Sequence, residues 1–228
     1  MLPPQDDIFA VFDESIKELM EWDIVFITSK ILAIHQWRCI SIDSISKKEL
    51  IEKEADKWIT TDIVPGKDIY ITIKNNILIP SAGIDESNSN GHYILWPNNL
   101  SHLTQQIHTY LCKKHDIKNL WIIITDSTTR PLKWWVVGIG MYSFGINPLR
   151  DERWAKDIFG RELQITQINI IDALSATAIY LMGEWNECQP IVIGREIPDI
   201  EYTTEDVYPT IEIPPEKDLY YPLLQPLF

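Results

Sequence analysis

Two short segments of this chain of 228 residues place a carboxylate and a hydroxyl directly after a run of apolar residues. The first is the loop Ser81-Ala-Gly-Ile-Asp-Glu-Ser-Asn88, which contains Asp85. The second is the pair Asp126-Ser127, and a third acid, Glu184, follows the end of a predicted helix. Hard divalent cations prefer oxygen ligands and share them with phosphate. Three acids at the ends of three separate elements therefore predict a site for divalent cations and a phosphate-bearing ligand.

Each of these residues also has a simpler interpretation. Asp85 and Asn88 could form a turn in which their side chains bond the backbone. Asp126 could cap a helix or a turn, and Glu184 could be a solvated helix end. Lys30, which follows Ser29 at the end of a predicted strand, is more often a surface charge than a phosphate ligand. The residues alone leave these alternatives open.

The composition excludes several classes of protein. A net charge of −13 argues against nucleic-acid binding, which needs a Lys/Arg surface, and means that cations must bring in any phosphate-bearing substrate. The three cysteines are far apart and lack the spacing of a zinc site or disulfide framework. The apolar stretch 134–146 is too short and too interrupted by glycine to span a membrane. The residues after Met1 do not form a signal peptide, so we expect a cytoplasmic protein.

Helical and strand patterns alternate irregularly along the chain, which favours an α+β fold over a doubly wound sheet. The acidic, proline-rich tail over 196–228 is expected to wrap a surface or a partner in extended form. Asp172 is either a buried, paired acid that holds a dimer or a solvent-facing residue, and Trp134-Trp135 is expected to pack. We expect helices over 8–20, 46–58, 99–115 and 167–182, strands over 23–28, 120–125, 135–141 and 190–193, a hairpin of 68–73 with 77–80, and a charged loop over 151–164.

Six motifs occur along the chain in the order Ser29-Lys30, Ser81–Asn88, Ile124-Thr-Asp126-Ser127, Phe159-Gly-Arg-Glu-Leu163, Asp172-Ala-Leu and Met182-Gly-Glu184. In this order and at these spacings, they make the chain resemble the coenzyme F420-0:L-glutamate ligases over roughly residues 3–193. Those enzymes use GTP to add γ-linked glutamate to a deazaflavin cofactor precursor. The tail Glu216–Leu224 is similar to the ending of a bacterial branch whose members are labelled folate γ-glutamate ligases.

The resemblance implies a two-domain monomer in an intertwined homodimer, which binds GTP and two divalent ions, Mg²⁺ or Mn²⁺, with K⁺ as a further candidate. L-glutamate and a carboxylate-bearing cofactor precursor would be the substrates. By position, Asp85 and Asp126 would hold the first metal, and Ser127 and Glu184 the second. The implied nucleotide contacts are Asn88, Ser29, Lys30 and the segment from Met182, Gly183 and Glu184 to about residue 189.

The predicted chemistry agrees with these residue types. An amide forms from a carboxylate in water only after activation, usually as an acyl phosphate, and phosphoryl transfer depends on positioning and on metal ions more than on a protein nucleophile. The chain shows three acids, hydroxyls and a lysine, and no Ser-His or Cys-His pair. Glu86 is the candidate for accepting the amine proton. Arg130 is retained from the family pattern as a candidate phosphate ligand, although it could instead form a structural ion pair.

The sequence also departs from the family. The family's first strand and nucleotide-contacting loop should precede residue 3, so residues 1–195 are expected to be a ligase core of two subdomains that is truncated at its amino end. The second lysine of the family's first motif is Ile34 here. A relative that binds nucleotide and metal without catalysis, and a ligase acting on folate or another pterin, are therefore the alternative hypotheses.

Overall fold

The computed structural model describes residues 1–61 and 69–228, and its centre is a four-stranded sheet in the order β11-β1-β7-β8. Strand β1 (Ile24–Thr28) runs parallel to β7 (Trp121–Thr129), with Ile24 opposite Trp121. The outer strands, β8 (Val136–Phe144) and β11 (Ile191–Gly194), are antiparallel to their neighbours. The central strands are continuous runs of buried apolar residues, as expected for strands covered on both faces.

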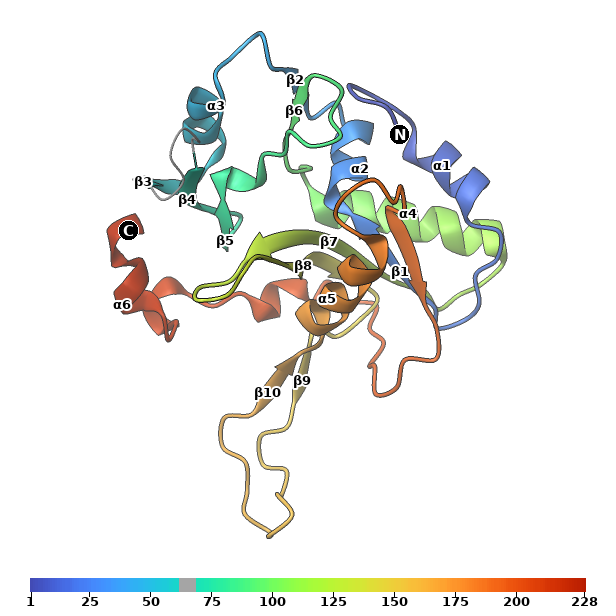
Figure 1. Cartoon of the computed structure of the whole chain (residues 1–228). Helices are drawn as coiled ribbons and strands as arrows, with labels where there is room; N and C mark the ends of the chain where they lie inside the picture. Colours follow the sequence, from blue (N-terminus) through green and yellow to red (C-terminus); the bar gives the residue numbers. More distant parts are fainter. Residues whose placement is uncertain (62–68) are drawn as a thin grey trace.

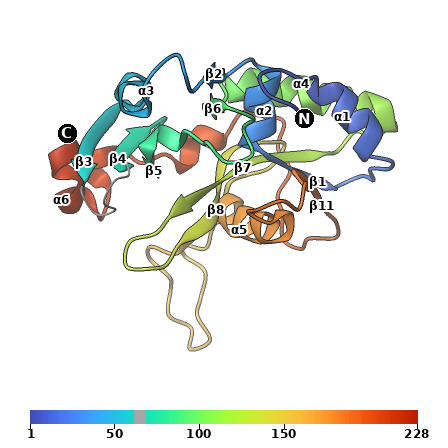
Figure 2. The ribbon, with the colours of Figure 1, turned by 45° about the horizontal axis from the view of Figure 1, so that its top comes forward.

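Helices cover both faces of this sheet (Figures 1 and 2). Helix α5 (Ile170–Met182) packs on one face, mainly against β8. Helices α2 (Ser29–His35) and α4 (Leu100–His115) pack on the other, where α1 (Ile8–Ser15) lies beside α2. The contact between α5 and β8 is close, because a Cβ added at Gly140 would lie 2.0 Å from Cγ2 of Ile171.

A smaller group of elements lies to one side of the central sheet and has its own hydrophobic cluster, which includes Leu50, Ile51, Tyr70 and Leu95. It contains α3 (Lys47–Glu54), the sheet β3 (Lys57–Thr61), β4 (Ile69–Lys74) and β5 (Ile77–Pro80), and the pair β2 (Cys39–Ser41) and β6 (His92–Ile94). Away from this group, the strands β9 (Leu149–Asp151) and β10 (Gln167–Asn169) lie next to α5 and begin a long arm that projects from the molecule (Figure 1).

The mixed α and β composition is confirmed, as are several elements. Asn75 and Asn76 form the turn between β4 and β5 with φ of 49° and 58°, the left-handed conformation that the hairpin prediction required. Asp68, which was predicted to begin the hairpin, lies outside the described residues. The charged segment over 151–164 is largely a loop. No helix in the described ranges is long and apolar enough to cross a membrane.

Three predicted helix boundaries are wrong. The helix expected over 46–58 ends at Glu54, because the residues after it pair as β3 with β4 and Lys74 Nζ binds the Glu54 carbonyl at 2.7 Å. The first helix ends at Ser15, although Ile16 and Leu19 beyond it are buried. The helix expected from residue 167 begins at 170, since 167–169 pair as β10 with β9.

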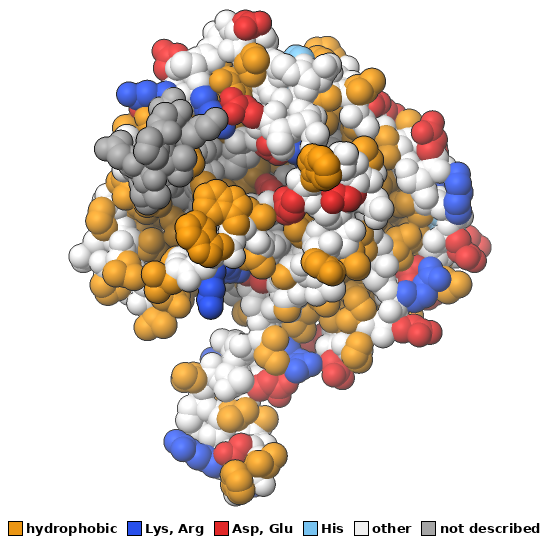
Figure 3. All heavy atoms as spheres, in the orientation of Figure 1, with side chains coloured by type: hydrophobic (Ala, Val, Ile, Leu, Met, Phe, Trp, Pro, Cys, Tyr) orange, Lys and Arg blue, Asp and Glu red, His pale blue; other side chains and the backbone are white. Residues whose placement is uncertain are grey.

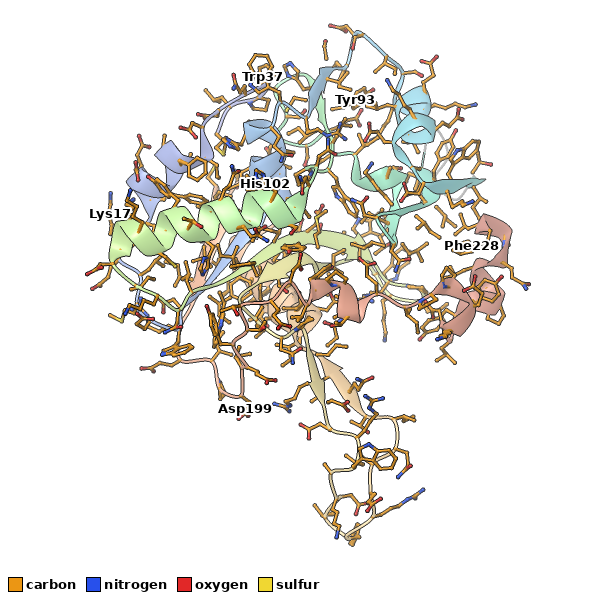
Figure 4. All side chains as sticks on the ribbon, turned by 180° about the vertical axis from the view of Figure 1, so that it is seen from behind. Lys17, Trp37, Tyr93, His102, Asp199 and Phe228 are labelled. Atoms are coloured by element: carbon orange, nitrogen blue, oxygen red, sulfur yellow. The ribbon has the colours of Figure 1, made fainter. Side chains whose placement is uncertain are left out.

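The tail is also different from the prediction, because it is not extended throughout. It forms 3₁₀ turns η2 (Tyr208–Ile211), η3 (Pro215–Lys217) and η4 (Gln225–Leu227) and the short helix α6 (Tyr221–Leu224). Tyr208 and Leu227 are buried, and the Tyr208 hydroxyl donates to the Gly140 carbonyl at 2.9 Å. The C-terminal Phe228 lies beside the smaller sheet (Figure 4). The tail therefore packs on the protein through these apolar residues, which its acidic composition did not suggest.

The pair Trp134-Trp135 does not pack as expected. The two residues lie in the turn between β7 and β8 and are 94% and 58% exposed. The division into two subdomains and a tail, and the intertwined dimer, stay predictions.

Candidate functional site

The loop after β5 is held in an unusual conformation. Ser81, Ala82 and Gly83 all have positive φ, of 51°, 55° and 69°. The Ala82 N–H donates to the hydroxyl of Thr72 on β4 at 2.8 Å, which ties the turn to the small sheet. The chain then leaves the turn toward β6, where Asp85 and Ile94 exchange both backbone hydrogen bonds, at 3.0 and 2.9 Å. The small side chains of the motif therefore permit a tight turn that places Asp85.

The Asp85 carboxylate already has partners. Its Oδ2 lies 2.5 Å from Nζ of Lys30, and its Oδ1 accepts the N–H and the hydroxyl of Ser87 at 2.7 and 2.9 Å. Lys30 also donates to the Ser87 carbonyl at 3.1 Å. Burial acts to raise the pKa of Asp85, but the charge of Lys30 and these hydrogen bonds together lower it. Asp85 is thus an ionised carboxylate whose neutralising cation is a lysine.

Asp126 lies within β7 and not after it, which corrects the predicted end of the strand. A register shift between Ile124 and Thr125 interrupts the pairing with β8 one residue before Asp126, and pairing then continues to Thr129. Such irregularities are common near active sites, where they redirect a side chain. The cap interpretation of this residue is therefore excluded.

Three donors hold the Asp126 carboxylate. Its Oδ2 accepts the hydroxyl of Ser29 at 2.9 Å and Nε1 of Trp96 at 2.5 Å, and its Oδ1 accepts the N–H of Ser127 at 2.7 Å. Burial raises the pKa of Asp126 to about 6 against the effect of these donors, and the negative charge of Asp85 adds to the rise. The three hydrogen-bond donors therefore compensate the negative charge of Asp126 only in part.

Glu184 enters the site from the end of α5. Gly183 ends the helix with φ 77° and ψ 170°, a conformation open to glycine and not the left-handed helix cap that we expected. Burial raises the pKa of Glu184 although the residue is exposed overall, and a hydrogen bond from Ser127 partly opposes this rise. Asp85 and Glu187 contribute as like charges. Ser127 thus contacts two carboxylates of the site, Asp126 through its backbone N–H and Glu184 through its side chain.

These residues line one cavity of about 420 Å³. On the face shown in Figure 3, acidic side chains border a hollow near the middle of the molecule. Asn88 closes one side of the cavity, because its Nδ2 donates to the Trp185 carbonyl at 2.7 Å. The sequence-predicted residues that line the cavity are Ser29, Lys30, Asp85, Asn88, Asp126, Ser127, Met182, Gly183 and Glu184.

Two predicted residues lie outside the cavity lining. Glu86 is exposed and pairs with Lys47 at 3.0 Å. Arg130 lies 3.9 Å from Asp172, whose Oδ1 also accepts the Gly140 N–H at 2.9 Å. Asp172 is therefore a paired acid, as one interpretation of its sequence position expected, and it is also partly exposed to solvent, as the other expected. The placement of Arg130 is that of a structural ion pair.

No sequence motif pointed to Trp96, and Ile34 stood out only as a departure from the family pattern. Trp96 lies in an apolar run before a proline, a pattern typical of a core residue, yet its N–H reaches the central carboxylate. Ile34 lines the cavity as an apolar residue where the family pattern has a lysine. Only the folded chain shows that both face the site.

The donor set suits hard cations but does not form a complete cage. Within the described part of the chain, no three His, Cys, Asp or Glu side chains are grouped closely enough to hold a metal ion by themselves. Carboxylates of Asp85, Asp126 and Glu184 with the Ser127 hydroxyl are oxygen donors of the kind that Mg²⁺ and Mn²⁺ prefer. Since Mg²⁺ is usually bound by few carboxylates together with substrate phosphates and water, these residues fit a cation that arrives with a nucleotide.

Comparison with known proteins gives a consistent result. Residues 1–196 match the family model described as F420-0:Gamma-glutamyl ligase. The chain is 29% identical over 218 residues to the Coenzyme F420:L-glutamate ligase of Methanopyrus kandleri, which covers 87% of this chain and 84% of that one. It is 30% identical over 198 residues to the protein of the same name from Methanococcus maripaludis, with 86% and 78% covered. A third protein of that name, from Methanocaldococcus jannaschii, is 37% identical over 131 residues, 57% of this chain and 52% of its own.

Proposed function

The chain belongs to the F420-0:γ-glutamyl ligase family, whose members form a γ-glutamyl amide bond, and we propose that it joins L-glutamate to a carboxylate of an F420-0-like cofactor precursor with GTP as the source of activation. The proposed site is the cavity of about 420 Å³ between the loop 81–88, strand β7 and the end of α5. The observation that carries the proposal is the convergence of Asp85, Asp126 and Glu184 there from three separate elements.

The proposed reaction has two steps. The acceptor carboxylate attacks the γ-phosphorus of GTP, which forms an acyl phosphate and releases GDP. The amino group of L-glutamate then attacks the acyl carbon, which forms the amide and releases phosphate and a proton. Divalent cations, when bound with the nucleotide, would neutralise charge that develops on the phosphate oxygens.

The residues of this chain would position the reactants. Asp85, Asp126, Glu184 and the Ser127 hydroxyl offer oxygen donors to the cations. Lys30 can exchange the Asp85 carboxylate for a phosphate oxygen, because its ammonium lies at the cavity wall and is held by an ion pair that is partly exposed to solvent. Asn88 and the 182–189 segment would bind the nucleotide, since they line the same cavity.

The position of Glu86 does not support its predicted role as the catalytic base. Glu86 was the candidate from sequence, but its carboxylate pairs with Lys47 outside the cavity lining. Released phosphate can accept the amine proton, so the proposed reaction does not depend on Glu86. Arg130 would need to leave Asp172 to reach a phosphate, and it is proposed only as a secondary ligand.

A relative that binds nucleotide and metal without catalysis is the second candidate. The observation that favours it is Ile34 in the cavity wall, because an apolar side chain there removes one cation that the family pattern supplies to the nucleotide. This alternative retains metal-dependent nucleotide binding but forms no product.

Product analysis separates the two candidates. The protein is incubated with GTP, L-glutamate, MnCl₂ or MgCl₂, and either F420-0 or folate, and products are identified by mass spectrometry. The proposal predicts a mass increase of one or more glutamyl units on F420-0 together with GDP and phosphate. A glutamylated folate would assign the pterin acceptor instead. GTP binding without any glutamylated product would favour the non-catalytic relative.

We further propose that the working unit is a homodimer, as the family resemblance predicts. The arm between β9 and β10 supports this, because Ile158, Phe159 and Ile165 on it are 92%, 89% and 88% exposed. Apolar side chains at such exposure are typical of an interface. Light scattering of the purified protein should give twice the monomer mass, and a monomeric mass would contradict the proposal.

A further inference from the structure

Trp96 is a buried side chain that contacts two parts of the proposed site at once. It is only 1% exposed and is the largest fully buried side chain of the chain's described part. Its Nε1 donates to Asp126 Oδ2 at 2.5 Å, which places the indole beside strand β7. The sequence motifs of the family resemblance do not include this residue.

The same Nε1 edge of the indole also faces the loop that carries Asp85. A Cβ added at Gly83 would lie 2.2 Å from Nε1 and 2.4 Å from Cε2 of Trp96. No real Cβ approaches so closely, so the loop backbone reaches the indole only because residue 83 is glycine. Gly83 precedes Asp85 by two residues, and its φ of 69° also suits glycine. The Nε1 edge of the indole therefore lies between the Asp126 carboxylate and the backbone of the loop that carries Asp85.

The hydrogen bonds of Asp126 show what the indole does to the carboxylate. An ionised carboxylate has about four lone-pair sites. Two donors, Trp96 Nε1 and Ser29 Oγ, occupy Oδ2, and the Ser127 N–H occupies one site on Oδ1. The remaining site lies on Oδ1, and the three donors, of which the Trp96 ring is the most rigid, hold the carboxylate in one orientation.

We propose that Trp96 is a positioning residue that orients the Asp126 carboxylate and sets its spacing to Asp85, and that it thereby determines the affinity of the site for a divalent cation. This inference rests on the proposed function, because it assumes that the two acids bind a cation. Outer partners of metal ligands commonly change affinity by about 10- to 100-fold.

The test separates the hydrogen bond from simple packing. The Trp96→Phe variant retains an aromatic ring against Gly83 but removes the N–H donor. Calorimetric titration with MnCl₂, in the absence and presence of GTP, should show binding about 10-fold weaker than that of the wild type. A role in packing alone would lower the melting temperature and leave the Mn²⁺ affinity within about twofold, and this result would overturn the inference.

Two glycines provide a matched second measurement that retains Trp96. Gly83 and Gly91 both have positive φ, of 69° and 78°, but a Cβ at Gly91 would meet nothing within 4 Å. Gly83→Ala and Gly91→Ala therefore carry similar backbone strain and differ in whether they displace the indole. We expect Gly83→Ala to weaken Mn²⁺ binding about 10-fold and Gly91→Ala to leave it nearly unchanged. Equal effects would overturn the inference even if Trp96→Phe did not fold.

The wild-type titration distinguishes failure of this inference from failure of the proposed function. If the wild type binds Mn²⁺ with GTP and Trp96→Phe binds equally well, only the role of Trp96 is refuted. If the wild type does not bind Mn²⁺ in either condition, the proposed cation site is refuted and the role of Trp96 with it.

Discussion

Replacing Lys30 by methionine should change metal binding and nucleotide binding in opposite directions. In the structure the Lys30 ammonium lies 2.5 Å from Asp85 Oδ2, so a cation that uses this carboxylate must displace it. The two side chains are 26% and 38% exposed, and solvent therefore screens the pair. We expect the ion pair to contribute about 1 kcal/mol, the upper end of the range for accessible pairs.

That free energy corresponds to a change of about fivefold in an equilibrium constant. Lys30→Met should therefore bind Mn²⁺ alone about fivefold more tightly than the wild type, because the competing ammonium is absent. GTP in the presence of Mn²⁺ should bind about 10-fold more weakly, since a charge-assisted hydrogen bond to phosphate is lost. Both constants come from calorimetric titration of the same preparation.

Lys47→Met is the matched control, since Lys47 pairs with Glu86 at 3.0 Å with a similar exposure of its own side chain, 25%, and lies outside the cavity lining. It should leave both affinities unchanged. Weaker binding of Mn²⁺ alone to Lys30→Met would show that Lys30 supports the cation site and does not compete with it, which would refute this account of the site.

Three further predictions concern the site and the stability of the fold. Asp126→Ala should abolish Mn²⁺-dependent GTP binding while the circular dichroism spectrum stays that of the wild type, and undiminished binding would refute the ligand assignment. Burial acts to raise the pKa of Asp23, but its hydrogen bonds, chiefly those from the Arg195 guanidinium at 2.8 Å, together outweigh burial and lower that pKa. Its contribution to stability should thus be complete above about pH 4 and be lost as pH falls through the lowered pKa, so urea unfolding midpoints should fall with acid less steeply in Arg195→Met than in the wild type. Tyr208→Phe should lower the free energy of unfolding by about 1 kcal/mol, because it leaves the Gly140 carbonyl without its donor, and an unchanged urea midpoint would contradict that.

The residue pattern predicted the elements that depend on local interactions. The hairpin around Asn75-Asn76 was predictable because its turn needs positive φ, which asparagine tolerates. The helix after Ser46 began as expected, because Ser46 and Glu49 form a capping box. Its end was not predictable, because residues 57–61 leave the helical pattern only to pair with a strand further along the chain.

The candidate site was predictable in its residues and not in its geometry. The loop 81–88 and Asp126-Ser127 contain the acids and hydroxyls that a cation site needs, and the structure places them at one cavity. The ion pair between Lys30 and Asp85 and the contact between Trp96 and Asp126 join residues 55 and 30 positions apart in the sequence. Such contacts follow from the packing of the smaller sheet on the central one, which no local pattern encodes.

The contact between Tyr208 and strand β8 has a consequence for work on shortened or chimeric forms of this protein. The match to the family model stops at residue 196, but the tail beyond it covers part of the hydrophobic core. Removing the tail at that boundary would expose the edge of β8 and the residues under Tyr208 to water. A domain exchange with a relative should therefore transfer the tail and the central sheet together, because the tail side chains pack against this particular sheet.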